Sequence, residues 1–393
     1  MAATIEWPDV IRRGSDGEER AGSPLRDERT AAILGIALGI SFTVCFATGL
    51  YSHWAQSTDP LIAFPARPAG LYRVTQATHV FTGVLSIPLL LAKLWTVLPK
   101  FFRLPPVASV PHLIERVSLL PLVGGGLFLL VTGLNNVAAW YPWEFGFVAA
   151  HYWAAWITIG ALIAHVGAKS STTRRALRRG GGDGDSRDGE SRVDGGLGRR
   201  GFFASIGALA FFLAASVESQ SIAPFRPLGL LSPRDLSKGP QGFPVNSSAA
   251  RRGVTETATS PDYRLRVTGA VSSELSFTLD ELRAMPRHEA ELPIACVEGW
   301  SKSARWAGIR LRDLLAMAGA AERASCTVVS LQERGGFRSS FVNHDHAGDP
   351  DTLLALEING EDLHIDHGFP VRLIGPNRPG VNQTKWVTEV RVS

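Results

Sequence analysis

The sequence predicts a membrane-embedded, all-α bundle of five helices followed by a mixed α and β (α+β) domain. From about residue 30 to 168 apolar runs with few charges dominate, whereas from about residue 235 apolar and polar residues alternate as in a soluble domain. The length of 393 residues also exceeds that of one typical domain. We therefore expect two structurally different parts in one chain.

Five apolar stretches with few charges are long enough to cross about 30 Å of hydrocarbon. The fifth is the shortest, and it begins directly after two arginines. The expected spans are 31–51, 74–98, 117–138, 147–168 and 201–217. The predicted parts are a cytoplasmic tail (1–29), a four-helix membrane domain (30–168), a flexible cytoplasmic linker (169–200), a fifth transmembrane helix (201–217) and a catalytic domain (235–393).

Basic residues alternate between the two ends of the spans, and Lys and Arg resist translocation. The opposing loops contain only Arg67 and Arg73. This pattern predicts a multi-pass protein of the cell membrane, with a cytoplasmic N-terminus and an extracytoplasmic catalytic domain. The basic residues on the inner side are Arg12, Arg13, Arg20, Arg26, Arg29, Lys100, Arg103, Arg116, Lys169, Arg174, Arg175, Arg178 and Arg179.

The excess of basic over acidic residues, 40 against 36, is concentrated near these apolar segments. It suits contact with membrane lipid, and no nucleic-acid partner is expected because no basic stripe interleaved with aromatic residues occurs.

The linker 169–200 is rich in Gly, Arg, Asp and Ser, a composition typical of flexible segments. At its end, the stretch Gly198-Arg199-Arg200-Gly201-Phe202-Phe203 precedes an apolar run and resembles a twin-arginine export signal. Ordinary inner-flank arginines would look the same, so both interpretations stay open. Export of a folded domain would suit a domain that acquires its cofactor in the cytoplasm.

Three histidines lie within the expected spans, where ionisable side chains are costly and usually functional. His151 and His165 are 14 residues apart on one helix, which places them about 21 Å apart on nearly the same face. Such spacing would serve two b-type haems stacked across the bilayer. His79, near the outer end of its span, can face His151 and complete an outer pair of axial ligands to haem iron.

The sequence offers a less complete pair of ligands for the inner haem. The residue 14 positions after His79 is Lys93, so His165 has only His112 as a candidate second ligand. The alternative is that the histidines form hydrogen bonds with neighbouring helices.

The stretches 77–80, 88–95, 140–143 and 151–153 resemble the membrane cytochrome b subunits that bring electrons to bacterial redox enzymes. The resemblance implies a cytochrome b-like membrane domain that binds haem b and exchanges electrons with membrane quinone or quinol. The aromatic cluster Trp140, Tyr141 and Trp143 equally suits an interfacial belt.

The C-terminal part contains patterns of both strands and helices. Alternation from Tyr263 predicts a strand, and Thr278 with Glu281 forms a capping-box pattern that opens a short helix. A second helix is expected over 311–315, and further strands over 327–331 and 371–374.

The three cysteines, Cys45, Cys296 and Cys326, do not suggest a disulfide framework, because the first falls in an apolar run. Cys296 follows a strand-like approach in the stretch 294–301 and enters a loop. Taken alone, a single cysteine is most often a small buried hydrophobe.

Together with its neighbours, Cys296 forms a motif that is more specific than a single cysteine. Cys296-Val-Glu-x-Trp-Ser is followed by Trp306 and Gly308, and later by 367–372 and 385–386. In order and spacing, residues 240–393 resemble the sulfite oxidase superfamily, and within it the branch of the periplasmic methionine sulfoxide reductase catalytic subunit.

This resemblance implies a molybdopterin cofactor and a catalytic role for Cys296 as the thiolate ligand of molybdenum. It further implies that His367, Arg372 and Lys385 hold the pterin and its phosphate, and that Asn246 contacts the pterin. Without the resemblance, the histidine could be a turn residue and the two cations ordinary surface charges.

The sequence also departs from the family. The chain stops seven residues after Trp386, so we expect no immunoglobulin-like dimerisation domain. The arginine doublet that binds sulfite in eukaryotic sulfite oxidases is replaced by 299–302, which puts sulfite as substrate in doubt. Arg305 and Arg338 are the remaining candidate anion contacts.

The run His344, Asp345 and His346 offers potential metal ligands, but no second ligand group has suitable spacing. We therefore expect a solvated loop there.

Together these observations predict a molybdopterin-dependent oxidoreductase that transfers an oxygen atom to or from a small-molecule substrate and is coupled to the quinone pool through haem b. A sulfite-oxidising dehydrogenase with the opposite electron flow is an alternative. Another is a non-catalytic electron-transfer cytochrome, against which the retained Cys296 argues. A transporter bundle is disfavoured because Leu, Gly, Ala and Val dominate the middle of the spans.

Overall fold

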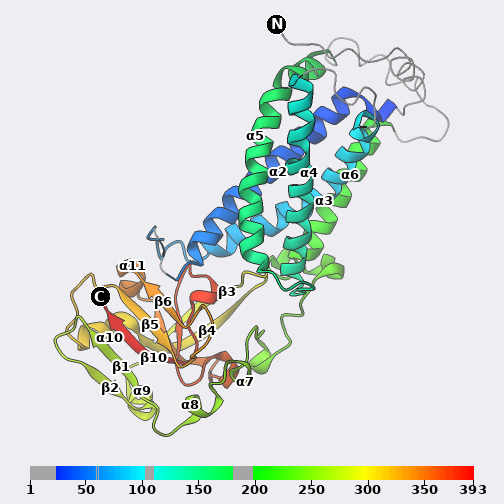
Figure 1. Cartoon of the computed structure of the whole chain (residues 1–393). Helices are drawn as coiled ribbons and strands as arrows, with labels where there is room; N and C mark the ends of the chain where they lie inside the picture. The colour runs from blue at the N-terminus through cyan, green and yellow to red at the C-terminus, as the bar shows by residue number, and fades with distance from the viewer. Residues whose placement is uncertain (1–23, 59, 61, 102–109, 180–197) are drawn as a thin grey trace. The chain divides into compact units, whose positions relative to one another are not determined.

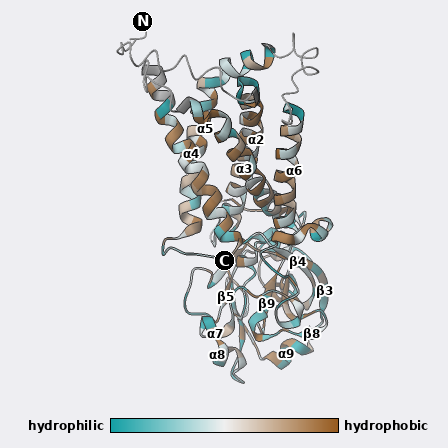
Figure 2. Ribbon diagram, turned by 90° about the vertical axis from the view of Figure 1, so that its right-hand side faces the viewer, coloured by the Kyte–Doolittle hydropathy of each residue, from teal (hydrophilic) through white to brown (hydrophobic). Residues whose placement is uncertain are grey.

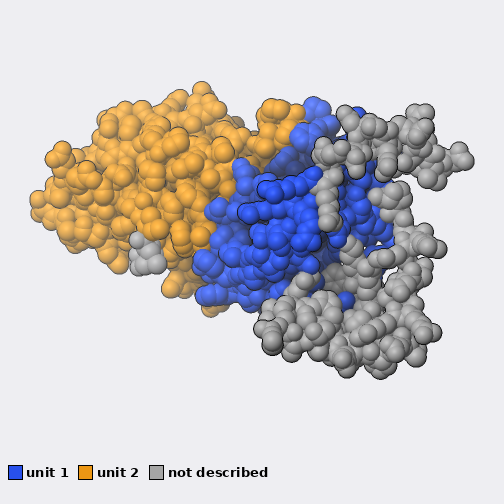
Figure 3. Space-filling model, turned by 90° about the horizontal axis from the view of Figure 1, so that it is seen from above, with its two compact units in different colours: residues 1–47, 78–217, 227–231 blue, residues 48–77, 218–226, 232–393 orange. Residues whose placement is uncertain are grey.

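The computed structural model describes residues 24–58, 60, 62–101, 110–179 and 198–393 (Figure 1). The chain forms two compact units, each assembled from separate stretches (Figure 3). The helical unit comprises residues 1–47, 78–217 and 227–231, and the sheet unit comprises residues 48–77, 218–226 and 232–393.

Five helices among the described residues are long and apolar enough to cross a membrane. Hydrophobic residues cover most of their length (Figure 2). This confirms the five-helix fold class expected from the apolar runs. In chain order, after a short 3-10 helix η2 (Pro24–Arg26), they are α2 (Glu28–Ala55), α3 (Leu71–Phe101), α4 (Val110–Val137), α5 (Phe147–Arg179) and α6 (Arg199–Glu218).

Small residues let α4 and α5 approach closely, as is common between membrane helices. A Cβ atom added at Gly125 of α4 would lie 2.2 Å from the hydroxyl oxygen of Thr158 on α5. That hydroxyl donates to the carbonyl of Ala154 at 2.8 Å, so it is satisfied within its own helix. The contact therefore depends on the missing side chain at Gly125.

The predicted start of the linker, at residue 169, is wrong. Helix α5 continues to Arg179, so residues 169–179 are helical. Their Ala, Lys, Arg and Ser content permits helix continuation, whereas the glycine-rich composition begins only at Gly180. The rest of the expected linker, 180–197, lies outside the described residues, and α6 begins at Arg199.

The sheet unit contains two five-stranded sheets. In the first, ordered β2-β1-β10-β5-β6, strand β10 runs parallel to β1 and antiparallel to β5. In the second, ordered β3-β4-β7-β8, strand β9 also pairs with β7. The strands are β1 (Leu265–Gly269), β2 (Leu275–Phe277), β3 (His288–Ala295), β4 (Ser301–Arg310), β5 (Cys326–Ser330), β6 (Ser339–Val342), β7 (Leu353–Ile358), β8 (Glu361–Asp362), β9 (Arg372–Ile374) and β10 (Val387–Val392).

Short helices connect these strands, and the α+β class expected from the sequence is confirmed. The predicted capping box opens α9: the Thr278 side chain accepts from the Glu281 N–H, and the Glu281 carboxylate accepts from the Thr278 N–H. The helices are α7 (Ala249–Arg252), α8 (Thr255–Thr259), α9 (Leu279–Ala284), α10 (Leu311–Met317) and α11 (His344–Gly348), with 3-10 helices η3 (Ala223–Leu231), η4 (Pro240–Gly242), η5 (Ile365–His367) and η6 (Gly380–Asn382).

The sheet unit includes residues from between the first two long helices. Asn377, in the loop after β9, is buried against this segment. Its Oδ1 accepts the Tyr72 N–H at 2.7 Å near the start of α3, and its Nδ2 donates to the Pro65 carbonyl at 2.7 Å. Its backbone N–H donates to the Ala69 carbonyl at 2.8 Å. One side chain thus caps a helix and fixes a loop.

An ion pair reinforces this attachment. The Arg67 guanidinium binds the Asp349 carboxylate through two hydrogen bonds, of 2.8 and 2.9 Å. Apolar contacts add to it, because Tyr72 and Phe64 pack with Ala295 at the end of β3. Residues 48–77 are therefore an integral part of the sheet unit.

Candidate active site

The predicted metal ligand lies in a tight turn between two paired strands. Strand β3 ends at Ala295, and β4 begins at Ser301. Within the turn, the Cys296 N–H donates to the Trp300 carbonyl at 2.9 Å, and the Gly299 N–H donates to the Cys296 carbonyl at 3.0 Å. The paired strands and these two bonds hold the buried thiol in a defined place.

A chain of polar side chains leads to the thiol. Asn246 Nδ2 donates to the Cys296 sulfur at 2.7 Å. Arg234 Nη1 in turn donates to Asn246 Oδ1 at 2.9 Å, and Arg234 also pairs with the Glu298 carboxylate. The chain from Arg234 through Asn246 to Cys296 fixes the orientation of the amide. Asn246 was predicted to contact the pterin, and the structure brings it to the predicted metal ligand.

Burial and the Glu298 carboxylate raise the pKa of the Cys296 thiol to about 12. A thiol with this pKa keeps its proton at neutral pH unless a metal cation replaces the proton, since metals bind the thiolate. None of the three cysteines forms a disulfide bond. The environment of Cys296 therefore suits a metal ligand better than an unassisted nucleophile.

Arg372, in β9, is a buried cation. Its Nη1 donates to the His367 carbonyl at 3.0 Å, and its guanidinium carbon lies 5.4 Å from the centre of the Trp306 ring. Burial lowers the pKa of Arg372 to about 9. Among the residues that the structure describes, no group forms a hydrogen bond with its buried Nε.

Lys385 is a second cation in the same region. Its Nζ donates to the carbonyls of Asp366 at 2.7 Å and Ser247 at 2.9 Å. Burial, and then the charge of Arg372, lower the pKa of Lys385 to about 7. Within the described part of the chain, neither cation forms an ion pair with a carboxylate. Two desolvated cations with mainly carbonyl partners fit an anionic group such as the phosphate of molybdopterin.

Backbone geometry brings the two cations together. Gly368 has a φ of +113°, and a Cβ atom added there would lie 3.1 Å from the Lys385 Cβ and 3.2 Å from the Arg372 Cβ. Asn246 contacts the Cys296 sulfur while the next residue, Ser247, binds the Lys385 ammonium. The segment 246–247 thus connects the thiol with Lys385.

His367 has a different setting from the one expected. It is buried, and its Nε2 lies 2.8 Å from the Pro240 carbonyl, to which it donates. Burial lowers the pKa of His367 to about 4. The structure therefore gives His367 a role in holding the segment before Asn246, and a contact of His367 with the pterin remains a prediction.

The other candidate anion contacts have partners elsewhere. Arg305 lies 3.8 Å from the exposed Glu289 carboxylate, and Arg338 donates to the Glu333 carbonyl at 3.0 Å. Arg234 was missed by sequence reasoning, because its link to Cys296 passes through Asn246, far away in the sequence. Glu298 could have been found, since it stands within the motif two residues after the cysteine.

In the helical unit, His79 of α3 faces His151 of α5. Their ring centres are 6.1 Å apart. Metal–imidazole bonds of about 2 Å on each side would place two ring centres about 6 Å apart. His79 Nδ1 lies 2.8 Å from the Cys45 carbonyl, and His151 Nδ1 lies 2.9 Å from the Thr132 hydroxyl. Partners at Nδ1 are typical of histidines that bind metal through Nε2.

The predicted inner haem gains no support. Lys93 donates from Nζ to the Ala31 carbonyl at 2.6 Å. His165 lies on α5 as expected, but the side chain of His112 falls outside the described residues. His165 as a ligand of haem iron remains a prediction.

The expectation of a solvated loop at 344–346 is wrong. These residues begin helix α11, which Asn343 caps by accepting from the His346 N–H at 3.0 Å. His346 is buried because the helix turns it inward, while His344 lies nearer the surface. Among the described residues no group of three or more His, Cys, Asp or Glu side chains could hold a metal ion.

Comparison with known proteins finds similarity in the C-terminal part of the chain. Residues 252–393 match the family model described as the oxidoreductase molybdopterin binding domain. These residues are thus similar to the molybdopterin-binding domains of sulfite oxidases. Rat mitochondrial sulfite oxidase is 35% identical to the chain over 160 residues, which are 34% of this chain and 29% of the rat protein.

Two bacterial proteins are similarly related to the chain. An uncharacterised oxidoreductase of Bacillus subtilis, YuiH, is 31% identical over 130 residues, which cover 33% of this chain and 64% of that protein. YedZ1 of Azospira oryzae, named as a protein-methionine-sulfoxide reductase subunit, is 31% identical over 151 residues, covering 38% of this chain and 56% of that protein. The chain thus spans less than two thirds of each of these relatives.

Among solved structures, the sulfane dehydrogenase SoxCD of Paracoccus pantotrophus matches with 26% identity and a TM-score of 0.31. The match covers 34% of this chain and 38% of the SoxCD chain.

Proposed function

We propose that the protein is a membrane-bound, molybdopterin-dependent oxidoreductase that transfers an oxygen atom to or from a small molecule outside the cytoplasmic membrane. One observation carries the proposal. In a domain that matches the molybdopterin-binding family model, the segment 246–247 connects the buried Cys296 thiol with Lys385, and the cation Arg372 lies beside Lys385 at Gly368.

The bound cofactor supplies two-electron oxygen-atom chemistry at molybdenum. Cys296 would hold the metal through its sulfur, and Asn246 would orient that sulfur through its amide N–H. Arg372 would bind phosphate oxygens through the fork of its guanidinium, and Lys385 would add a point charge. His367 would keep the preceding 3-10 helix η4 in place through the Pro240 carbonyl.

We further propose that the helical unit binds haem b between His79 and His151 and exchanges single electrons with membrane quinone or quinol. The spacing of the two rings and their Nδ1 partners support this role. A second, inner haem on His165 is part of the same proposal, and it rests on the spacing of His151 and His165 along α5.

The residues that follow Cys296 bear on the direction of electron flow. The arginine doublet that binds sulfite in eukaryotic sulfite oxidases is absent after Cys296. We therefore favour the reduction of an S-oxide or N-oxide with electrons from quinol. Sulfite oxidation with the opposite flow is the second candidate, favoured by the similarity to sulfite oxidases.

The positions of the basic residues support a cytoplasmic N-terminus and an extracytoplasmic catalytic domain. The twin-arginine route and ordinary membrane insertion differ in whether export needs Arg199 and Arg200 as arginines. Arg199 Nη2 pairs with the Asp27 carboxylate at 2.7 Å, so it also has a structural contact. A conservative Arg200→Lys change would block export by the twin-arginine route and leave ordinary insertion unaffected.

The decisive experiment is metal analysis and a reduced-minus-oxidised optical spectrum of the detergent-purified protein. We expect about one molybdenum per chain, lost in Cys296→Ser and retained in the matched variant Cys326→Ser, whose thiol is also buried. Molybdenum retained in Cys296→Ser would refute the ligand assignment.

The optical spectrum tests the haem separately. His151→Ala should abolish the outer haem signal while molybdenum stays bound. Haem bands without molybdenum in the unaltered protein would instead favour the electron-transfer cytochrome. Assays of S-oxide reduction and of sulfite oxidation then decide the direction.

A further inference from the structure

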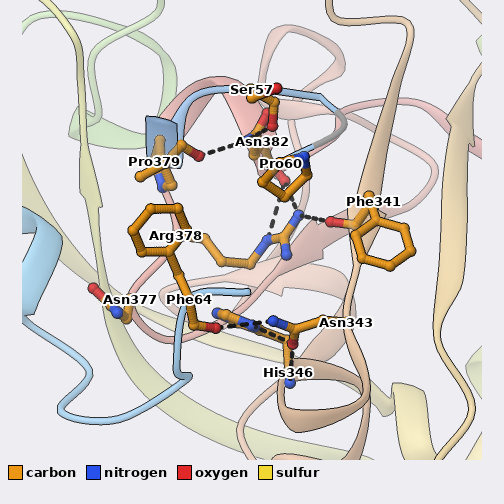
Figure 4. A pocket seen from close by; sticks show the side chains of 11 residues that line it. Ser57, Pro60, Phe64, Phe341, Asn343, His346, Asn377, Arg378, Pro379 and Asn382 are labelled. Atoms are coloured by element: carbon orange, nitrogen blue, oxygen red, sulfur yellow. Dashed lines mark hydrogen bonds between the residues drawn. The ribbon is translucent and has the colours of Figure 1, made fainter. Parts of the chain in front are cut away.

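A pocket in the sheet unit has no role in the proposed chemistry. It lies between the segment after α2, the β6–α11 connection and the loop after β9 (Figure 4). Its volume is about 370 Å³, including space that opens to solvent.

The pocket contains a buried cation. Arg378 is 7% exposed, and its guanidinium extends between Asn382 on one side and His346 with Asn343 on the other (Figure 4). Its Nε and Nη2 donate to the Asn382 carbonyl at 3.3 and 2.9 Å, and Nη2 also donates to the Phe341 carbonyl at 3.0 Å. The backbone thus fixes one edge of the guanidinium.

The other edge is available to a ligand. Among the described residues, Nη1 of Arg378 has no hydrogen-bond partner, and no carboxylate forms an ion pair with this side chain. Carbonyl oxygens satisfy donors but leave the formal charge without a counter-ion. A buried charge without a counter-ion is costly, so an anion beside Nη1 would be favourable.

His346 adds an acceptor to the same pocket. It is buried, and its Nδ1 lies 2.9 Å from Asn343 Oδ1. Asn343 Nδ2 donates to the Phe64 carbonyl at 2.9 Å, which fixes the orientation of the amide. The Pro376 carbonyl is a second acceptor beside the ring. Because the Asn343 amide oxygen, 2.9 Å from Nδ1, only accepts, the proton of a neutral His346 lies on Nδ1. The lone pair on Nε2 then has no donor among the described residues.

We propose that this pocket binds a small oxyanion that retains a proton, of the class of hydrogenphosphate or hydrogensulfite. Its oxygens accept from Arg378 Nη1, and its O–H donates to His346 Nε2. Chloride lacks the donor, and water alone would leave the charge of Arg378 uncompensated.

The position of the pocket relates it to the Cys296 turn. Pro379, which lines the pocket, pairs with Ala295, the residue before Cys296. The inference does not depend on the proposed function, because none of the predicted cofactor ligands lines the pocket.

The test uses calorimetric titration of the cofactor-loaded full chain with phosphate at pH 6 and constant ionic strength. Loaded protein is needed because free Arg372 and Lys385 could also bind phosphate. Ser57 is exposed and lines the pocket, which allows a matched pair of variants. Ser57→Glu places a carboxylate near the cation, whereas Ser57→Gln keeps the size without the charge.

We expect saturable phosphate binding in the unaltered protein and in Ser57→Gln, with affinity at least about tenfold weaker in Ser57→Glu, which corresponds to about 1.4 kcal/mol. Arg378→Gln should abolish the binding, and the Ser57 pair keeps the test valid if that variant does not fold. Sulfate, which has no proton at pH 6, should bind several-fold more weakly.

Three results would overturn the proposal. The first is the absence of saturable binding, which would mean a pocket filled by water only. The second is equal affinity in the two Ser57 variants. Equal binding of sulfate and phosphate would refute the role assigned to His346.

Discussion

The buried Lys385 side chain should make the stability of the folded protein depend on pH. Burial and the charge of Arg372 lower its pKa from the ordinary 10.5 to about 7 in the folded protein. Below pH 7 both folded and unfolded chains hold the proton, and the full cost of the buried charge is present. Between pH 7 and 10.5 the unfolded chain binds more protons than the folded one, so stability rises with pH.

We therefore expect the melting temperature of cofactor-free protein to rise from pH 7 towards pH 10 relative to that of Lys385→Met, measured by thermal unfolding in detergent. Lys238→Met, at an exposed position, should behave like the unaltered protein. Bound cofactor should reduce the difference, because an anion beside Lys385 favours the charged form. Identical pH profiles of the unaltered protein and Lys385→Met would contradict the assignment.

At the scale of single residues, the structure brings together several candidates that the sequence singled out, and their roles toward a cofactor stay predictions. Cys296, Asn246, Arg372 and Lys385 lie in one region, joined by hydrogen bonds and a short backbone segment. Arg234 could not be predicted, because its role depends on a contact between residues 12 and 64 positions apart, with Asn246 and Glu298.

Among the elements, the contact between α4 and α5 depends on one glycine. Gly125→Ala would place a methyl group 2.2 Å from the Thr158 hydroxyl, and the helices would have to separate. Gly124→Ala is the matched control, because nothing lies within 4 Å of the Cβ position there. We expect Gly125→Ala to lower the melting temperature and weaken the haem spectrum, and Gly124→Ala to change neither.

Combining Gly125→Ala with Thr158→Ala should restore the melting temperature and the haem spectrum in part, because the second substitution removes the clashing hydroxyl oxygen. Failure of this rescue would mean that another contact makes Gly125 necessary.

Asn377 gives a second test at this scale. Asn377→Ala would leave the Tyr72 N–H and the Pro65 carbonyl without their partners, at a cost of at least about 2 kcal/mol. The expected result is a melting temperature lower by about 5 °C, and faster hydrogen exchange in residues 65–72. Arg283→Ala, which removes a partly exposed ion pair with Asp362, should leave both measurements unchanged.

Helix and strand positions were largely predictable because hydrophobic periodicity and capping are local. The capping box at Thr278 and the strands at 327–331 and 371–374 follow from neighbouring residues, and the structure confirms them within a residue or two. The burial of His346 was not predictable, since it depends on how α11 packs within the sheet unit.

At the scale of the whole molecule, the division into units differs from a simple cut between membrane and soluble halves. Apolar length predicts where helices run, but it does not predict which folded unit their ends join. Residues 48–77 and 218–226 join the sheet unit. Their partners include Asn377, Asp349 and Gly299, which lie far away in the sequence.

A shortened chain of residues 232–393 tests this division. We expect it to be less stable than the same residues in the full chain. It lacks residues 48–77, which contain the hydrogen-bond partners of Asn377 and the apolar side chains that cover Ala295. Resistance to limited proteolysis provides the measurement. A shortened chain as protease-resistant as the full protein would show that the added segments are dispensable.

The discontinuous sheet unit has a consequence for biogenesis. On the proposed topology, residues 48–77 emerge with the first helical hairpin, early in synthesis, and must wait for strands made some 200 residues later. A domain loaded with its cofactor inside the cell would arrive on the far side with the patch around Ala295 still bare. The last event in its maturation would then be the docking of a loop already present at the membrane surface.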